Sequence, residues 1–169
     1  MLLGIAVTVW YTTRGTQECL DDGRICLSYD SDWKKEDIIS NDLDKYILLR
    51  LQRGNPKGEF QITAQPGQAN VAEQAFQKSI TDKLNEELDG FRLVSSSVIR
   101  IDDSQAASFT YQYRYQNSQN KQVDNQQQLI IWPASDRVYY MTAQADPDNF
   151  EKITNATDRI ISSLQQVKR

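Results

Sequence analysis

Residues 17–33 read QECLDDGRICLSYDSDW, a run in which two cysteines stand symmetrically about an Asp-Gly pair. Asp22-Gly23 between short apolar runs is a strong hairpin signal, because both turn residues must adopt positive φ. A turn at this pair places Cys19 directly opposite Cys26. Directly opposed residues of an antiparallel pair have Cα atoms about 4.5–5.5 Å apart, a separation that a disulfide spans. The sequence therefore predicts a hairpin closed by a Cys19–Cys26 disulfide.

This pair indicates a compartment, because disulfides persist in oxidising spaces and are rare in the cytosol. The chain contains two cysteines, so none is left over. The alternative interpretation is a cytosolic domain with two free, buried cysteines, since free cysteine packs as a small apolar residue.

Composition excludes several classes of function. The chain has 169 residues, enough for one domain and a short appendage, and its net charge of −4 gives no basic excess for nucleic acid. It contains no histidine, which removes imidazole metal sites and catalysis by Ser-His or Cys-His pairs. Catalysis by carboxylates, lysine or tyrosine stays open.

The N-terminal stretch is apolar but short. Residues 2–11 read LLGIAVTVWY and carry no charge, whereas a membrane-spanning helix needs about 20 residues. Three interpretations are open: the end of a longer anchor or signal whose start lies upstream of Met1, a β-strand of the fold, or a short signal or interfacial segment. We expect residues 1–16 to form a tether or truncated signal or anchor, and residues 17–169 to form one globular domain.

Strand and helix patterns follow in a definite order. The predicted elements are a hairpin at 19–29, strands at 43–52 and 60–64, a helix at 70–88, a meander over 91–145, and a helix from Asp146 to the C-terminus. In the first helix, apolar residues recur every four positions from Ala72 to Leu88, Asn70 with Glu73 forms a capping pair, and Gly90 ends the helix. This order predicts the α+β class, with an antiparallel or mixed sheet of about six strands flanked by helices.

Particular residues in this order resemble the PsbP-like fold family. Residues 22–29 followed by Trp33 are similar to the opening of the family, although Asp30 stands where a proline is usual. Residues 138–143 are similar to its near-terminal strand, and residues 150–164 to its closing helix. The resemblance covers residues 22–166 and implies an α/β/α sandwich. It also implies a non-enzymatic protein, often outside the cytoplasm, that binds a larger assembly, with no shared catalytic residues to transfer.

Aromatic residues are the candidate interaction surface. Tyr111, Tyr113 and Tyr115 alternate along one strand and project from the same face, and Trp33 and Trp132 stand at strand ends. Packing in or at the edge of the core is the default interpretation of these five side chains, and the interaction surface is the alternative.

Acidic residues offer weaker candidates. Asp21, Asp22, Asp30 and Asp32 gather near the hairpin and make calcium a minor alternative, but their spacing does not fit an EF-hand loop. Glu86, Glu87 and Asp89 could supply an acid–base pair. Both sets are typical of solvated turns and helix faces, so we expect no cofactor and no bound metal.

These observations predict a non-catalytic binding or accessory domain of the cell envelope. It would be extracytoplasmic, tethered to the membrane through its N-terminal segment, and act through protein–protein contact. An extracellular carboxylate-dependent hydrolase and an intracellular adaptor with reduced cysteines are the alternatives.

Overall fold

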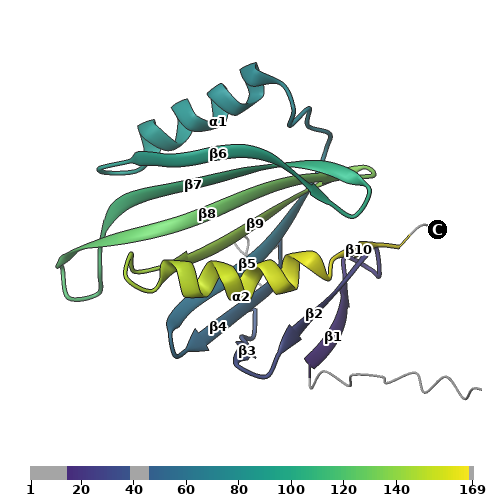
Figure 1. Cartoon of the computed structure of the whole chain (residues 1–169), viewed down its shortest axis with the longest axis horizontal. Coiled ribbons are helices and arrows are strands. Elements are labelled where there is room, and N and C mark those ends of the chain that lie inside the picture. Colours follow the sequence, from purple (N-terminus) through teal and green to yellow (C-terminus); the bar gives the residue numbers. More distant parts are fainter. Residues whose placement is uncertain (1–14, 39–45, 168–169) are drawn as a thin grey trace, which may run out of the picture.

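The computed structural model describes residues 15–38 and 46–167. Its larger sheet has seven strands, all paired antiparallel, in the order β3-β4-β5-β9-β8-β7-β6 (Figure 1). The strands run over Trp33–Lys35 (β3), Ile47–Gly54 (β4), Lys57–Pro66 (β5), Arg92–Ile101 (β6), Ser104–Gln116 (β7), Gln122–Ala134 (β8) and Arg137–Ala145 (β9).

A second sheet of three strands has the order β1-β2-β10. Its strands are Gly15–Leu20 (β1), Ile25–Asp30 (β2) and Gln165–Gln166 (β10). The α+β class with flanking helices is confirmed, but the expected six strands in one sheet were too few. The predicted hairpin pairs with the end of the chain rather than with the main sheet, a long-range pairing that local patterns do not reveal.

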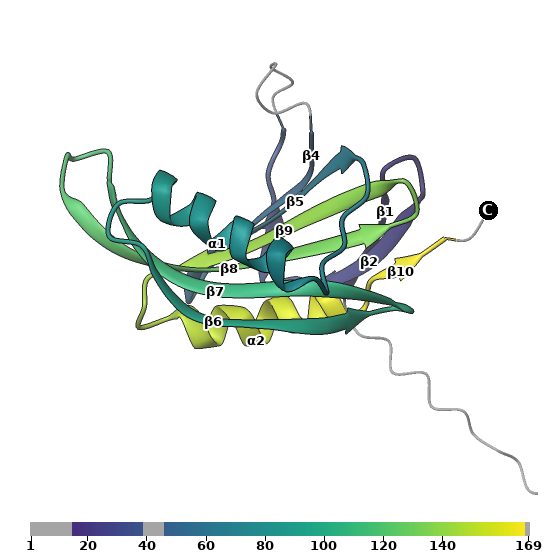
Figure 2. The same ribbon diagram turned by 90° about the horizontal axis from the view of Figure 1, so that it is seen from above.

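The two helices lie on opposite faces of the main sheet (Figure 2). Helix α1 spans Gln74–Glu87 and lies beside β6, whereas α2 spans Phe150–Ser162 and packs against β2, β5, β8 and β9. Six residues of α2 are buried, while no residue of α1 is. The sheet face under α2 therefore holds the more completely buried part of the core. None of the helices in the described ranges is long and apolar enough to cross a membrane.

Both helices begin later than predicted. Asn70 does not cap α1, because its side-chain amide donates to the Glu73 carboxylate at 2.6 Å and the helix starts after Glu73. Asp146 likewise accepts from the backbone N–H of Asn149 at 3.1 Å, so residues 146–149 form a turn before α2. Helix α1 ends at Glu87, before the predicted stop, and the left-handed φ of 62° at Gly90 belongs to the turn that follows the helix.

The opening hairpin has the predicted register, with Cys19 opposite Cys26. Asp22 and Gly23 have positive φ as expected, and Asp21 joins them with a φ of 54°. The structure links the two cysteines in a disulfide with Cα atoms 4.0 Å apart. Of the predicted tether, residues 1–14 lie outside the described ranges, and residues 15–16 begin β1.

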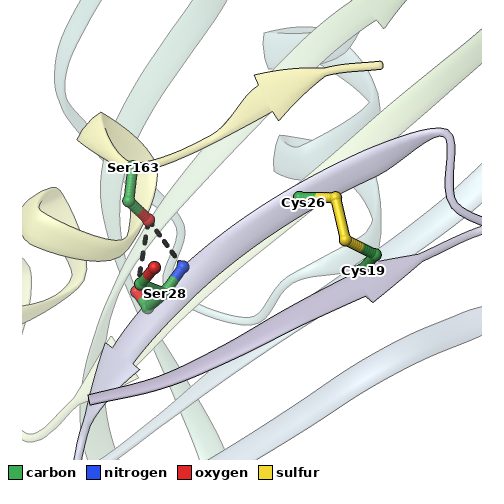
Figure 3. The surroundings of a disulfide bond; sticks show 4 residues. All are labelled: Cys19, Cys26, Ser28 and Ser163. Atoms are coloured by element: carbon green, nitrogen blue, oxygen red, sulfur yellow. Dashed lines mark hydrogen bonds between the residues drawn. A yellow bond between two sulfur atoms is a disulfide. The ribbon is translucent and has the colours of Figure 1, made fainter. Parts of the chain in front are cut away.

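Hydrogen bonds attach this hairpin to the end of α2 (Figure 3). The Ser163 hydroxyl accepts from the Ser28 backbone N–H at 2.8 Å and lies 3.2 Å from the Ser28 carbonyl oxygen. The disulfide lies two residues along β2 from this contact. Residues near the two ends of the described chain are thereby held together.

A largely buried carboxylate connects the hairpin turn to the main sheet. The Asp21 side chain is 7% exposed and accepts a hydrogen bond from the Tyr139 hydroxyl at 2.8 Å. It also lies 3.6 Å from the Arg137 guanidinium and 3.9 Å from that of Arg24. Of the four carboxylates considered for calcium, Asp21 contacts protein donors and cations, and Asp32 pairs with Arg53 at 2.7 Å.

Replacing both Cys19 and Cys26 by serine should lower the free energy of unfolding by about 2–3 kcal/mol at most. The closed loop is short, so the entropy that the disulfide removes from the unfolded chain is small. Urea denaturation of the oxidised protein and of the variant measures the difference. A variant that cannot fold would contradict this prediction and indicate a larger structural role.

Tyr139→Phe should cost about 1–3 kcal/mol, because it leaves a largely buried carboxylate without one donor. Tyr140→Phe is the matched control, since no hydrogen bond joins its hydroxyl to any described residue, and its effect should stay within about 0.5 kcal/mol. Chemical denaturation of both variants gives the comparison. Equal effects of the two substitutions would show that the Asp21 contact does not stabilise the fold.

Candidate functional site

The three predicted surface tyrosines form a ladder on one face of β7. Ring centroids lie 6.0 Å apart between Tyr111 and Tyr113 and 6.3 Å apart between Tyr113 and Tyr115. Exposure rises along the ladder, from 2% at Tyr111 through a half-buried Tyr113 to 47% at Tyr115. Burial raises the pKa of the Tyr111 phenol. Tyr111 therefore belongs to the core, and the alternative of an interaction surface does not hold for this residue.

Both predicted surface tryptophans are also buried. Trp132 is fully enclosed and donates its indole N–H to the Ser104 hydroxyl at 2.7 Å. Its ring is tilted against that of Tyr139, with the ring centroids 5.4 Å apart. Trp33 is 4% exposed and meets Phe60 edge-on at 6.5 Å. The large apolar area of an indole favours burial where a neighbouring element can cover it. Neither side chain can contribute to an exposed binding surface.

The exposed end of the tyrosine ladder borders a concavity of about 480 Å³. Strands β5, β7, β8 and β9 all contribute to its lining. Its central side chains are Glu59, Tyr113, Tyr115, Asn125 and Gln144. The pairs Tyr113–Asn125 and Glu59–Gln144 each stand directly opposite one another on neighbouring strands, which brings them to one face.

These polar groups bond to one another. The Asn125 amide donates to the Tyr113 hydroxyl at 2.7 Å, and that hydroxyl donates to the side-chain amide oxygen of Gln127 at 3.2 Å. The Gln144 amide donates to Glu59 at 2.6 Å, and Asn125 is only 7% exposed. The network therefore offers hydrogen-bonding groups to a ligand, but its members do not form a nucleophile–base pair.

Sequence reasoning missed this network. Residues 122–128 read QVDNQQQ, a polar run that gives no apolar alternation to mark a strand. The one indication of this network is that the amide side chains of β8 lie opposite tyrosines of β7 on the same face of the sheet. Only the register of β7 against β8 makes that match visible.

The acidic candidates do not converge on a reaction centre. Glu59, Asp124 and Asp146 lie around the concavity, yet no group of three histidine, cysteine or acidic side chains in the described ranges could hold a metal ion. Glu87 pairs with Lys83 at 3.8 Å and Asp89 with Arg114 at 3.5 Å. The predicted acidic set at the end of α1 therefore contributes surface ion pairs.

The outer strand β6 is a second exposed feature. It forms one edge of the main sheet, and its residues 92–98 are all exposed. Val94 is 49% exposed, Val98 39% and Leu93 37%. Exposed apolar side chains on an unpaired edge are unusual in a protein that stays monomeric.

Unfolding should become easier above about pH 10, the ordinary pKa of a phenol. Burial raises the pKa of Tyr111, and burial together with the hydrogen bond to Asp21 raises that of Tyr139. The stability that their neutral forms supply is therefore complete below the unfolded pKa and is lost as pH rises toward the folded pKa, by up to about 1.4 kcal/mol per pH unit for each phenol. Urea midpoints between pH 8 and about 11 measure this slope, which Tyr139→Phe should reduce. A slope unchanged by that substitution would contradict the assignment to Tyr139.

Comparison with known proteins gives structural matches alone. No known protein-family model and no curated protein matches the sequence. A structure from Bacteroides thetaiotaomicron superposes with a TM-score of 0.59 at 15% identity over 92% of this chain, which spans only 50% of that longer protein.

Two named proteins match over most of their length. Cyanobacterial PsbP from Synechocystis sp. PCC 6803 has a TM-score of 0.56 at 10% identity, over 98% of this chain and 99% of its own. LpqN of Mycobacterium tuberculosis has a TM-score of 0.56 at 15% identity, over 94% of this chain and 88% of its own. These matches, with the antiparallel sheet between two helices, confirm the resemblance inferred from the sequence: the chain has a PsbP-like fold.

Proposed function

We propose that this chain is a non-catalytic accessory domain of the cell envelope that acts through protein–protein contact. The observation that carries the proposal is the Cys19–Cys26 disulfide, which joins two strands of a surface hairpin with Cys19 exposed to solvent. A disulfide so accessible to reductants is typical of an oxidising compartment and rare in the cytosol.

The N-terminal sequence and the structural matches support the same location. The uncharged residues 2–11 precede the hairpin closely and suit a membrane tether. LpqN is described as involved in cell envelope biogenesis, and it shares the fold at low identity. An accessory role fits a chain without histidine whose most enclosed polar residues, such as Asn125, bond to their neighbours.

A carboxylate-dependent hydrolase is the second candidate, favoured by Glu59, Asp124 and Asp146 around the concavity. Such an enzyme needs two carboxyl groups acting together on a bound substrate. Turnover of model ester, glycoside or peptide substrates by the purified chain, abolished by Glu59→Gln, would replace the accessory role by this one.

Labelling in intact cells tests the proposed location. Both cysteines should resist a membrane-impermeant maleimide until a membrane-impermeant reductant is added, and should then react, because the disulfide is exposed outside the cytoplasm. A cytosolic protein with surface cysteines serves as the control and should stay unlabelled throughout. Free thiols in the cytosolic fraction would instead support the intracellular adaptor.

A further inference from the structure

Strand β6 is a long edge strand with little protection over most of its length. It pairs with β7 on one side, and no described strand pairs with its other side. Such an edge presents unpaired backbone N–H and C=O groups that can accept another strand. Natural proteins commonly protect edges with lysine, proline or short length, whereas β6 has ten residues and its sequence between the two arginines is LVSSSVI.

A bulge interrupts β6 at Val94, which has no partner on β7 because Leu93 pairs with Tyr111 and Ser95 with Thr110. Beyond this point, Ser95–Ile101 keeps an unbroken register with β7. Seven residues exceed the usual minimum for a β-strand pairing of about three. The bulge therefore limits the docking stretch but leaves it long enough.

Helix α1 provides an apolar flank for this edge. Its stripe of Phe76, Ile80, Leu84 and Leu88 packs toward the sheet but stays only half-buried. Leu93 and Val98 lie on the same face, since their partners on β7 belong to the cluster under α1. A strand added to β6 would cover these two side chains and extend the sheet beside the helix.

The charged residues of β6 indicate which side chains an added strand should carry. Arg92 and Arg100 stand near the two ends of β6, and the strand has no acidic residue. Arg92 bonds to the Gln112 amide oxygen at 2.5 Å and Arg100 lies 3.4 Å from the Asp103 carbonyl oxygen, but neither pairs with a carboxylate in the described part of the chain. Both guanidinium groups therefore remain available to carboxylates of a partner, although Asp102 and Asp103 follow the strand directly.

We propose that β6 accepts an extended, acid-flanked segment of another protein as an additional strand of the main sheet. This inference rests on the proposed accessory function and specifies its contact. Main-chain hydrogen bonds along Ser95–Ile101 would hold the segment. A carboxylate opposite Arg100, and a second one extending past the bulge to Arg92, would select it. A second copy of the chain is a poorer occupant, because pairing two β6 strands brings two arginines from each copy to one junction.

A defined peptide tests the contact. The probe alternates valine and threonine over about eight residues with glutamate at both ends, and a lysine-ended version is its control. On addition of the glutamate probe, amide hydrogen exchange within Ser95–Ile101 should slow. Arg92→Glu/Arg100→Glu should weaken binding of this probe by roughly tenfold and improve binding of the lysine version.

Matched variants separate the edge from general surface effects. Val98→Lys should reduce binding, whereas Val167→Lys, at a position of similar exposure beyond β10, should leave it unchanged. Thermal melts confirm that each variant is folded. Equal binding to both peptides, protection on another strand, or dimers that protect β6 without any probe would overturn the proposal.

Photo-crosslinkers placed at Val94, Tyr115 and Val167 in intact cells distinguish this inference from the proposed function. A protein adduct at Val94 that Arg92→Glu/Arg100→Glu abolishes supports strand addition. An adduct at Tyr115 alone overturns strand addition but leaves the accessory role intact. No adduct at any position, together with free cytosolic thiols, would overturn both.

Discussion

Packing of helix α2 against both sheets is the interaction on which the rest of the structure depends. Its buried face contacts β5 and β9 of the main sheet and β2 of the small one, so a single helix joins the two. The approach to β5 is close: a Cβ on Gly58 would lie 2.5 Å from Ile153, a separation that only glycine avoids. Beyond the helix, β10 pairs with β2, so the end of the described chain holds its beginning.

The two faces of the main sheet are covered unequally, and the less covered face exposes the surfaces that could bind a partner. The large side chains Trp132, Phe60 and Ile153 fill the side under α2. On the other side, α1 covers one end of the sheet and buries none of its own residues. The polar concavity and the β6 edge both belong to this less covered region. Stability and binding are therefore assigned to different parts of one sheet.

Local sequence predicted the features that local chemistry determines. The Asp22-Gly23 turn set the register of the hairpin, and apolar residues at every fourth position indicated helix α1. Burial of Trp33 and Trp132 and the carboxylate contacts of Asp21 depend on segments more than a hundred residues away or on neighbouring strands, so no local pattern could reveal them. The meander over 91–145 was predicted, but the exposure of its first strand β6 was not, because a strand exposed on both faces lacks apolar alternation.

The position of β6 relative to the hairpin determines which way the exposed edge would face if the N-terminus were tethered to a membrane. In Figure 1 the strands β1 and β2 lie at one end of the molecule, and β6 with α1 lies at the other. A membrane tether ahead of β1 would therefore hold the hairpin nearest the bilayer and turn the β6 edge away from it. The disulfide and the Ser28–Ser163 contact brace the end that would bear the tether. Such a geometry suits a domain that presents an open strand to a partner at a distance from the membrane.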